Sequence, residues 1–270
     1  MQNNKISALA APFHHLGDHC LALLADLGSM GLFFVSALAG LFRRPFRGRE
    51  LLRQLRFIGA GSIAVIFFTA LSSGMVLGLQ GSYTLNKFGA EGMLGSAVSL
   101  TLIMELGPIL TALMVAGRAG SAICAEIGIM RISEQIDALE CMAVDPFRYL
   151  ISPKFLAAII SVPLLTAMFD VVGIWGGYIA GVQLMGANSG SYFSSMSQSI
   201  TNHEIRLGLI KSFVFALLVI WISAGRGYFV YRIRGAGFGA ESVSKVTTQA
   251  VVLSSIAVLI FDYLLTAVLL

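Results

Sequence analysis

Charged residues are scarce in this sequence. Asp, Glu, Lys and Arg account for 12% of its 270 residues, about half of their share in an average soluble protein, whereas apolar residues account for 57%. The mean hydropathy is +0.84. Because a soluble domain cannot cover its surface with so few charges, the composition excludes a soluble protein. It predicts an all-α protein that crosses a membrane several times.

Motifs of enzymes and metal sites are also missing. The sequence contains no GxxxxGKS or GxxxxGKT phosphate loop, no Gly-x-Ser-x-Gly elbow and no HExxH motif. We therefore expect a chain without catalytic residues that does not hydrolyse ATP itself. Cys20, Cys124 and Cys141 have no metal or redox spacing, and His14 and His15 have no carboxylate or cysteine at ligand spacing. We expect no metal and no cofactor.

The basic residues lie beside apolar segments. The net charge is +4, and fifteen of the eighteen Lys and Arg residues fall in the N-terminal region or in two later polar segments. Lys87, Arg206 and Lys211 are the other three. This bias follows the positive-inside rule and argues against a nucleic acid partner. It predicts that the N-terminus and residues 118–153 are cytoplasmic and that the C-terminus lies on the opposite side.

Apolar segments of sufficient length predict about five transmembrane helices. They are residues 57–79, 94–117, 154–182, 207–225 and 246–269. Residues 20–42 are also apolar enough to span but contain Asp26, so they are compatible with a sixth span or with a helix in the membrane interface. Gly74 and Gly78 would allow close approach of another helix, and so would the glycines between 173 and 181. Residues 183–205 read as a polar, serine-rich outer loop.

The polar segment between the second and third spans has a helical pattern. Ile132, Ile136, Leu139 and Ala143 fall on one helical face. Two dipeptides, Asp145-Pro146 and Ser152-Pro153, each look like a helix N-cap followed by proline at the first helical position. We therefore expect helices along the membrane face, with an apolar side for a partner. The alternative is a loop helix that packs on its own spans.

Three acidic residues interrupt the apolar spans. Glu105 lies near the middle of the second span and is followed by Gly107 and Pro108. An acid in hydrocarbon is costly unless it is paired, protonated or wetted, and Pro108 bends the helix. We therefore expect a functional site at Glu105. We assign no role to Asp170 and Asp262 from the sequence.

A long set of motifs resembles the MlaE (YrbE) family of permeases. The matching motifs are Gly74–Gly81, Glu105–Pro108, Ala116–Arg118, Ala125–Glu126, Met130–Arg131, Glu134–Ile136, Met142–Pro146, Pro153 and Gly173–Gly177. The likeness covers nearly everything from Arg53 to the end. These permeases are the membrane subunits of bacterial ABC-type lipid transporters that work with MCE-domain proteins.

The resemblance implies a permease that moves phospholipid between the inner membrane and a periplasmic MCE protein, and so maintains outer-membrane lipid asymmetry in Gram-negative bacteria. The implied partners are an ABC ATPase subunit, the MCE protein, a small cytoplasmic STAS-domain subunit and a second copy of the chain. Residues 1–56 would form a cytoplasmic or interfacial helical region, and residues 57–270 the permease domain. The C-terminus would be periplasmic.

The resemblance and the span pattern together predict two sets of site residues. A lipid cavity between the first two spans would be lined by Leu77, Gln80, Thr84, Leu85, Phe88, Met104, Glu105 and Leu106. The segment 118–150 would couple to the ATPase through Arg118, Glu126, Arg131, Glu134, Ile136, Asp137 and Leu139. The alternative for the apolar members is ordinary packing. Some relatives carry a basic residue where Met104 stands, so direct phosphate pairing at that position is in doubt.

Two other functions remain open from the sequence. A proton-coupled secondary transporter could use Glu105, Asp170 and Asp262 as a relay, and it would depend on a proton gradient rather than on ATP. A non-transporting membrane scaffold would carry no bound lipid.

Overall fold

The computed structural model describes residues 21, 24–41, 48–232 and 239–269. After a helical segment at 24–41 come α2 (Gly48–Ile58), α3 (Ile63–Lys87), α4 (Leu94–Thr101), α5 (Gly107–Val115), α6 (Ser121–Ile132), α7 (Gln135–Cys141), α8 (Ser152–Tyr178), α9 (Ser189–Ser199), α10 (Asn202–Tyr228) and α11 (Ala240–Leu269). The 3-10 turns are η1 (Ala60–Ser62), η2 (Glu91–Met93) and η7 (Val230–Arg232). The π-helical turns are η3 (Leu102–Leu106), η4 (Ala116–Gly120), η5 (Phe147–Ile151) and η6 (Ile179–Leu184). His14, His15 and Cys20 lie outside the described residues.

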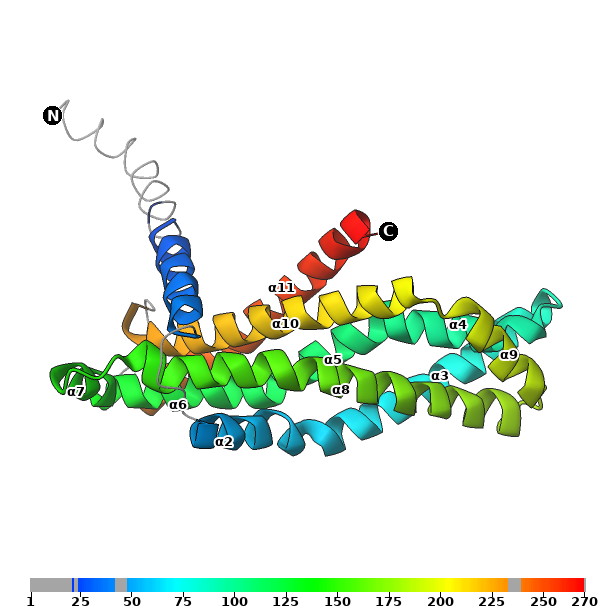
Figure 1. Ribbon diagram of the computed structural model, residues 1–270, viewed down its shortest axis with the longest axis horizontal. Coiled ribbons are helices and arrows are strands. Elements are labelled where there is room, and N and C mark those ends of the chain that lie inside the picture. Colours follow the sequence, from blue (N-terminus) through cyan, green and yellow to red (C-terminus); the bar gives the residue numbers. More distant parts are fainter. Residues whose placement is uncertain (1–20, 22–23, 42–47, 233–238, 270) are drawn as a thin grey trace, which may run out of the picture.

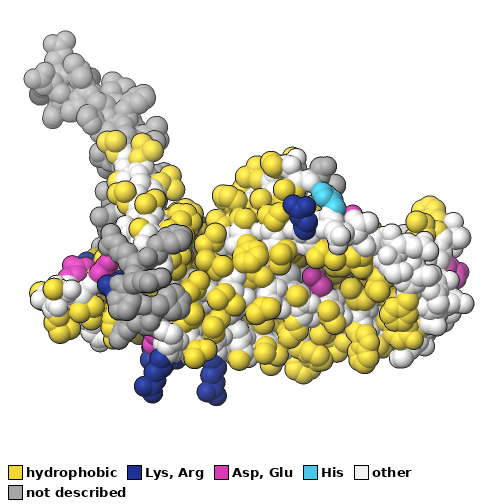
Figure 2. All heavy atoms as spheres, viewed as in Figure 1, with side chains coloured by type: hydrophobic (Ala, Val, Ile, Leu, Met, Phe, Trp, Pro, Cys, Tyr) yellow, Lys and Arg dark blue, Asp and Glu magenta, His cyan; other side chains and the backbone are white. Residues whose placement is uncertain are grey.

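The prediction of an all-α polytopic membrane protein is confirmed. Six helical runs are long and apolar enough to cross a membrane: Leu24–Leu41, Gly48–Lys87, Glu91–Ile132, Phe147–Leu184, Asn202–Tyr228 and Ala240–Leu269. The last five runs contain the five predicted spans. Hydrophobic side chains cover most of the elongated bundle, and Lys and Arg gather at the end that carries α2 (Figure 2).

The run Glu91–Ile132, which contains the predicted second span, is longer than expected, because it continues from η2 through α6 without a break. Residues 118–132 therefore extend the second span, and only α7 is a separate helix in this segment. The guanidinium of Arg118 explains the continuity. It donates hydrogen bonds to the carbonyl of Phe57 (2.6 Å) and to Ser62 Oγ (3.1 Å), so a charge at this point does not require the helix to end.

One of the two predicted N-caps is confirmed. The carboxylate of Asp145 accepts the backbone N–H of Phe147 at 3.0 Å, where η5 begins. At Ser152, the second predicted N-cap, no new helix starts, because the helix already runs through η5 into α8. The Ser152 hydroxyl donates back to the carbonyl of Phe147 at 3.0 Å.

Glycines bring α3 and α8 into close contact, as predicted. A Cβ atom on Gly74 would overlap the carbonyl oxygen of Gly173, and one on Gly78 would lie 2.6 Å from the carbonyl oxygen of Gly177. Small residues at these positions let the two backbones touch. In Figure 1, α3, α8 and α10 run along the length of the bundle.

The segment 24–41 takes another direction: it projects from the bundle at a steep angle to the long axis, near the C-terminal end of α10 (Figure 1). The indole N–H of Trp221 donates to the carbonyl of Met30 at 2.8 Å. The ring of Phe33 packs against Phe147 and Tyr228, with centroids 5.3 and 5.5 Å away.

The region expected to be an outer loop contains a helix, α9. The side chain of Asn188 caps it by accepting the N–H of Ser191 at 3.1 Å. Tyr192 is buried, which raises the pKa of its hydroxyl to about 12. The neutral hydroxyl donates to the carbonyl of Ile174 at 3.0 Å and fixes α9 on α8.

Candidate functional site

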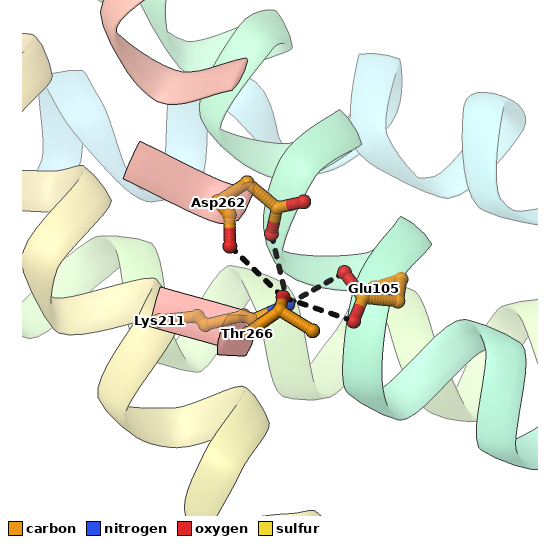
Figure 3. A network of polar contacts seen from close by, with 4 residues as sticks. All are labelled: Glu105, Lys211, Asp262 and Thr266. Atoms are coloured by element: carbon orange, nitrogen blue, oxygen red, sulfur yellow. Dashed lines mark hydrogen bonds and ion pairs between the residues drawn. The ribbon is translucent and has the colours of Figure 1, made fainter. Parts of the chain in front are cut away.

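Three helices meet at a charged network inside the bundle (Figure 3). The Lys211 ammonium of α10 lies 2.5 Å from Glu105 Oε2 of η3 and 2.9 Å from Asp262 Oδ1 of α11. The hydroxyl of Thr266, also on α11, lies 3.2 Å from Glu105 Oε1. We call these four residues the Lys211 network.

Burial differs sharply within the Lys211 network. The side chain of Lys211 is 0% exposed, that of Asp262 15% and that of Glu105 33%. An ammonium group inside a membrane protein requires compensation by negative charge. Lys211 has two carboxylates, so the network joins three helices and carries a net charge of −1 when its charged groups are ionised.

The local backbone explains how Glu105 reaches Lys211. Pro108 has no N–H to donate, and the N–H of Gly107 bonds to the carbonyl of Leu102, five residues back. This π-helical turn places an extra residue in the helix just where Glu105 projects. A Cβ atom on Gly208 would overlap the carbonyl of Ile103, so a glycine there allows α10 to approach the turn closely.

Predicted lipid-contacting residues line two adjoining hollows along α3. The first has a volume of about 280 Å³ and is bounded by Leu77, Gln80, Thr84 and Leu85 of α3 and by residues of α4. The second, of about 590 Å³, is lined by Leu77, Leu106 and polar and apolar residues of the preceding turns of α3. Because Leu77 borders both, we treat them as one groove, which we call the α3 groove.

The other three predicted residues lie elsewhere. Phe88 ends α3 and is 79% exposed. Met104 is half-buried and lines neither hollow. Glu105 faces α10 and α11, whereas its chain neighbour Leu106 lines the groove. The structure thus divides the predicted cavity into a mostly apolar groove and a polar network, and both include residues of η3.

Sequence reasoning missed Lys211, Asp262 and Thr266 as partners of Glu105. The available signal was a lysine and an aspartate in spans that are otherwise apolar, with Thr266 one turn after Asp262. Charges of opposite sign in separate spans are expected to pair inside a bundle. The sequence did not show which of the three intramembrane acids Lys211 contacts.

Asp170 lies apart from the Lys211 network. It lines a pocket of about 210 Å³ between α8 and α10, together with Ile103 and Gly208. Its Oδ1 is buried and has no hydrogen-bond partner within the described ranges. The structure therefore brings two of the three proposed relay acids to one lysine and leaves the third in a separate pocket.

Four residues of the predicted coupling set form contacts within the chain. Arg118 binds the η1 region, as described above. Glu126 of α6 pairs with the buried Lys154 of α8 at 2.6 Å. Arg131 pairs with Asp137 of α7 at 2.5 Å, and its guanidinium lies 5.1 Å from the ring centroid of Tyr228. These contacts fix α6 and α7 on the end of the bundle.

Ile136 requires a correction. It was expected on a face open to a partner, but it is 0% exposed and belongs to the hydrophobic core of the chain. Leu139 is half-buried, and Glu134 is exposed with a left-handed φ of 56° at the start of α7. Exposed apolar side chains at this end include Ile129, Met142 and Tyr149.

Within the residues that the structure describes, no group of three or more His, Cys, Asp or Glu side chains could hold a metal ion.

The comparison with protein families identifies the chain. The sequence profile of the family described as "Permease MlaE" matches residues 51–268. The chain belongs to the MlaE permease family. The match contains both predicted residue sets and the whole Lys211 network.

Curated relatives agree with membership of the MlaE permease family. The chain is 42% identical to the "Intermembrane phospholipid transport system permease protein MlaE" of Haemophilus influenzae, over 94% of this chain and 95% of the relative. It is 34% identical to a "Probable ABC transporter permease protein" of Synechocystis, over 94% and 92% of the two chains. The chloroplastic protein TRIGALACTOSYLDIACYLGLYCEROL 1 of Arabidopsis thaliana is 32% identical over 81% of this chain and 61% of its own length.

Proposed function

We propose that this chain is the membrane-spanning, non-catalytic permease subunit of an ATP-driven phospholipid transporter in the bacterial inner membrane. It would pass lipid between that membrane and a periplasmic MCE protein and so maintain outer-membrane lipid asymmetry. The observation that carries the proposal is the α3 groove beside the Lys211 network, in a chain of the MlaE permease family. An apolar groove next to a polar network suits an amphiphilic cargo.

The proposal includes partner subunits. A separate ABC ATPase would supply ATP hydrolysis and would bind the end of the bundle that carries α7, where Met142 is 64% exposed. A small STAS-domain subunit would bind on the same cytoplasmic side. Two copies of the chain would form the transporter, because ATP-driven transporters use two ATPase subunits and each of these would bind one copy of the permease.

The orientation of the chain follows from its charges. The N-terminus and α7 would be cytoplasmic, and the C-terminus periplasmic. The segment 24–41 would lie in the cytoplasmic interface, since it runs at a steep angle to the long axis of the bundle and Asp26 pairs with Arg226 at 3.4 Å.

A photo-crosslinking experiment tests transport through the α3 groove. A photoreactive amino acid at Leu77 or Leu85 should capture phospholipid, and the yield should change when ATP and vanadate trap the complete complex. Leu164 is the control position, because it is 66% exposed on α8 and should contact only bulk lipid, independently of ATP. Equal yields with and without ATP at all three positions would contradict the proposal.

Substitution of Glu105 separates a transport role from a structural one. Glu105→Gln keeps the shape and much of the hydrogen bonding, whereas Glu105→Leu removes both the charge and the hydrogen bonds. A transport role predicts that Leu impairs lipid transport strongly and Gln less, with the complex assembled. Loss of assembled complex in Glu105→Leu alone would indicate a structural role.

The energy source distinguishes the proposal from a proton-coupled transporter. Transport in proteoliposomes should require ATP and persist when a protonophore removes the proton gradient. Transport driven by the gradient without ATP would support the proton-coupled alternative.

A further inference from the structure

The Lys211 network offers acceptors, not donors, to its surroundings. The ammonium is 0% exposed and lies against two carboxylates. The Thr266 hydroxyl is already directed to Glu105 Oε1 and to the carbonyl of Asp262, at 3.2 and 2.9 Å. Among the three charged side chains of the network, that of Glu105 is the most exposed, at 33%. A cargo that reaches the network therefore meets carboxylate oxygen.

The net negative charge of the network also favours a positively charged group of the cargo. One ammonium faces two carboxylates, and no second cation is paired with Glu105 or Asp262 within the described residues. The chain neighbours of Glu105 are Met104 and Leu106, which add no charge. An ammonium group at the end of a zwitterionic headgroup would offset this negative charge locally and balance the phosphate of the same lipid. An anionic headgroup has a phosphate without an ammonium, so it would bring a further uncompensated negative charge into a poorly solvated region.

We infer that the Lys211 network binds the primary ammonium of a zwitterionic phospholipid headgroup, of the ethanolamine class, and disfavours anionic headgroups. The inference rests on the proposed function, because it assigns a headgroup to the cargo of the α3 groove. An alkylammonium group has three N–H donors and one positive charge, which match the acceptors and the charge of the network. The acyl chains would lie along the groove, which begins at Leu106, the residue next to Glu105.

The test uses the complete complex in membranes that contain both ethanolamine and glycerol phospholipids. A photoreactive amino acid at Leu106 captures the cargo, and mass spectrometry identifies the headgroup of the captured lipid. The same probe at Leu164 reports the composition of the bulk membrane. The ethanolamine-to-glycerol ratio at Leu106, divided by the ratio at Leu164, measures the preference of the site.

We expect a ratio well above one for the unmodified network. Loss of a charge-assisted hydrogen bond in Glu105→Gln should lower the ratio about tenfold. Asp262→Asn removes the other carboxylate charge and should also lower it, which keeps the test valid if one variant fails to assemble. Glu91→Gln is the matched control, because Glu91 is an exposed acid of η2 and its loss should leave the ratio unchanged.

Two other results are distinguishable. Capture of lipid at Leu106 with a ratio of one or less would overturn the headgroup inference and leave the transport proposal intact. Capture at Leu164 but at none of Leu77, Leu85 and Leu106 would overturn both.

Discussion

Lys211 is the residue on which the ion pairs between η3, α10 and α11 depend. It is buried, and it connects η3 to α11, which have no other ion pair between them among the described residues. Removing one member of a buried charge cluster leaves the others uncompensated, and this costs more than the cluster contributes when complete. Lys211 therefore has a larger effect on stability than its single charge indicates.

We predict that Lys211→Met lowers the stability of the complex by about 3–5 kcal/mol, because two carboxylates lose their cation. Thermal unfolding of the purified complex in detergent measures the change. Lys87→Met is the control, since Lys87 is exposed at the end of α3 and should have little effect. Equal unfolding temperatures for the two variants would contradict the assigned role of Lys211.

Replacing Asp170 should have the opposite effect on stability from replacing Lys211. Its Oδ1 is buried and has no partner among the described residues, so Asp170→Val removes an uncompensated polar group and should raise the unfolding temperature. Asp170→Asn keeps a polar group at the same position and should change the temperature less. A fully assembled Asp170→Val complex with no transport would instead assign Asp170 a role in transport.

The sequence identified Glu105 as important because an acid in the middle of an apolar span is unusual by itself. Its partners were not predictable in the same way. Lys211 is 106 positions away, and Glu105 and Asp262 became its partners only because α10 packs beside η3 and α11. Pairing among several candidate charges is a property of helix packing, which composition and periodicity do not specify.

At the scale of elements, close contact between α3 and α8 depends on glycine. We predict that Gly74→Ala reduces the amount of folded protein, because the added Cβ would overlap the carbonyl oxygen of Gly173. Gly117→Ala is the matched control. In the part of the chain that the structure describes, no atom outside its own helical turn lies within 4 Å of the Cβ position, so this substitution should stabilise the helix by up to about 1 kcal/mol. Fluorescence-detected size-exclusion chromatography compares the yields, and equal losses would contradict the prediction.

The helix α7 allows a docking surface to be separated from the core. Ile136→Asp should prevent folding, because it places a charge in the hydrophobic core. Met142→Asp changes an exposed side chain and should leave the permease folded while reducing the amount of ATPase that copurifies. Copurification of the ATPase at normal yield with Met142→Asp would exclude Met142 from the docking surface.

The elements were predictable to different degrees. The five spans were found because long apolar segments are a strong signal, and the cap at Asp145 was found because its side chain acts locally. The extension of the second span through Arg118 was not predictable, since it depends on acceptors about sixty residues earlier in the chain. The helix α9 was missed because its serines resemble those of a loop.

At the scale of the whole molecule, the segment 24–41 tests the topology. We predict that it does not cross the membrane, because it runs at a steep angle to the long axis of the bundle and packs on the end of α10. In a variant without native cysteines, a cysteine at Ser7, which lies outside the described residues, should resist an impermeant thiol reagent added outside spheroplasts. A cysteine in the outer turn at Gly92 provides the positive control, and labelling at both positions would establish a sixth span.

The Lys211 network also has a consequence for biosynthesis. The chain is made from its N-terminus, and Lys211 follows Glu105 by 106 residues. At about 5–20 residues per second, Glu105 waits about 5–20 s after its own synthesis before its ammonium partner exists. Its span must therefore enter the membrane as an unpaired acid, either protonated or held where water or the insertion machinery can solvate it. Asp262 arrives later still, so the final arrangement of the charged side chains is reached only after the last of the described helices has been inserted.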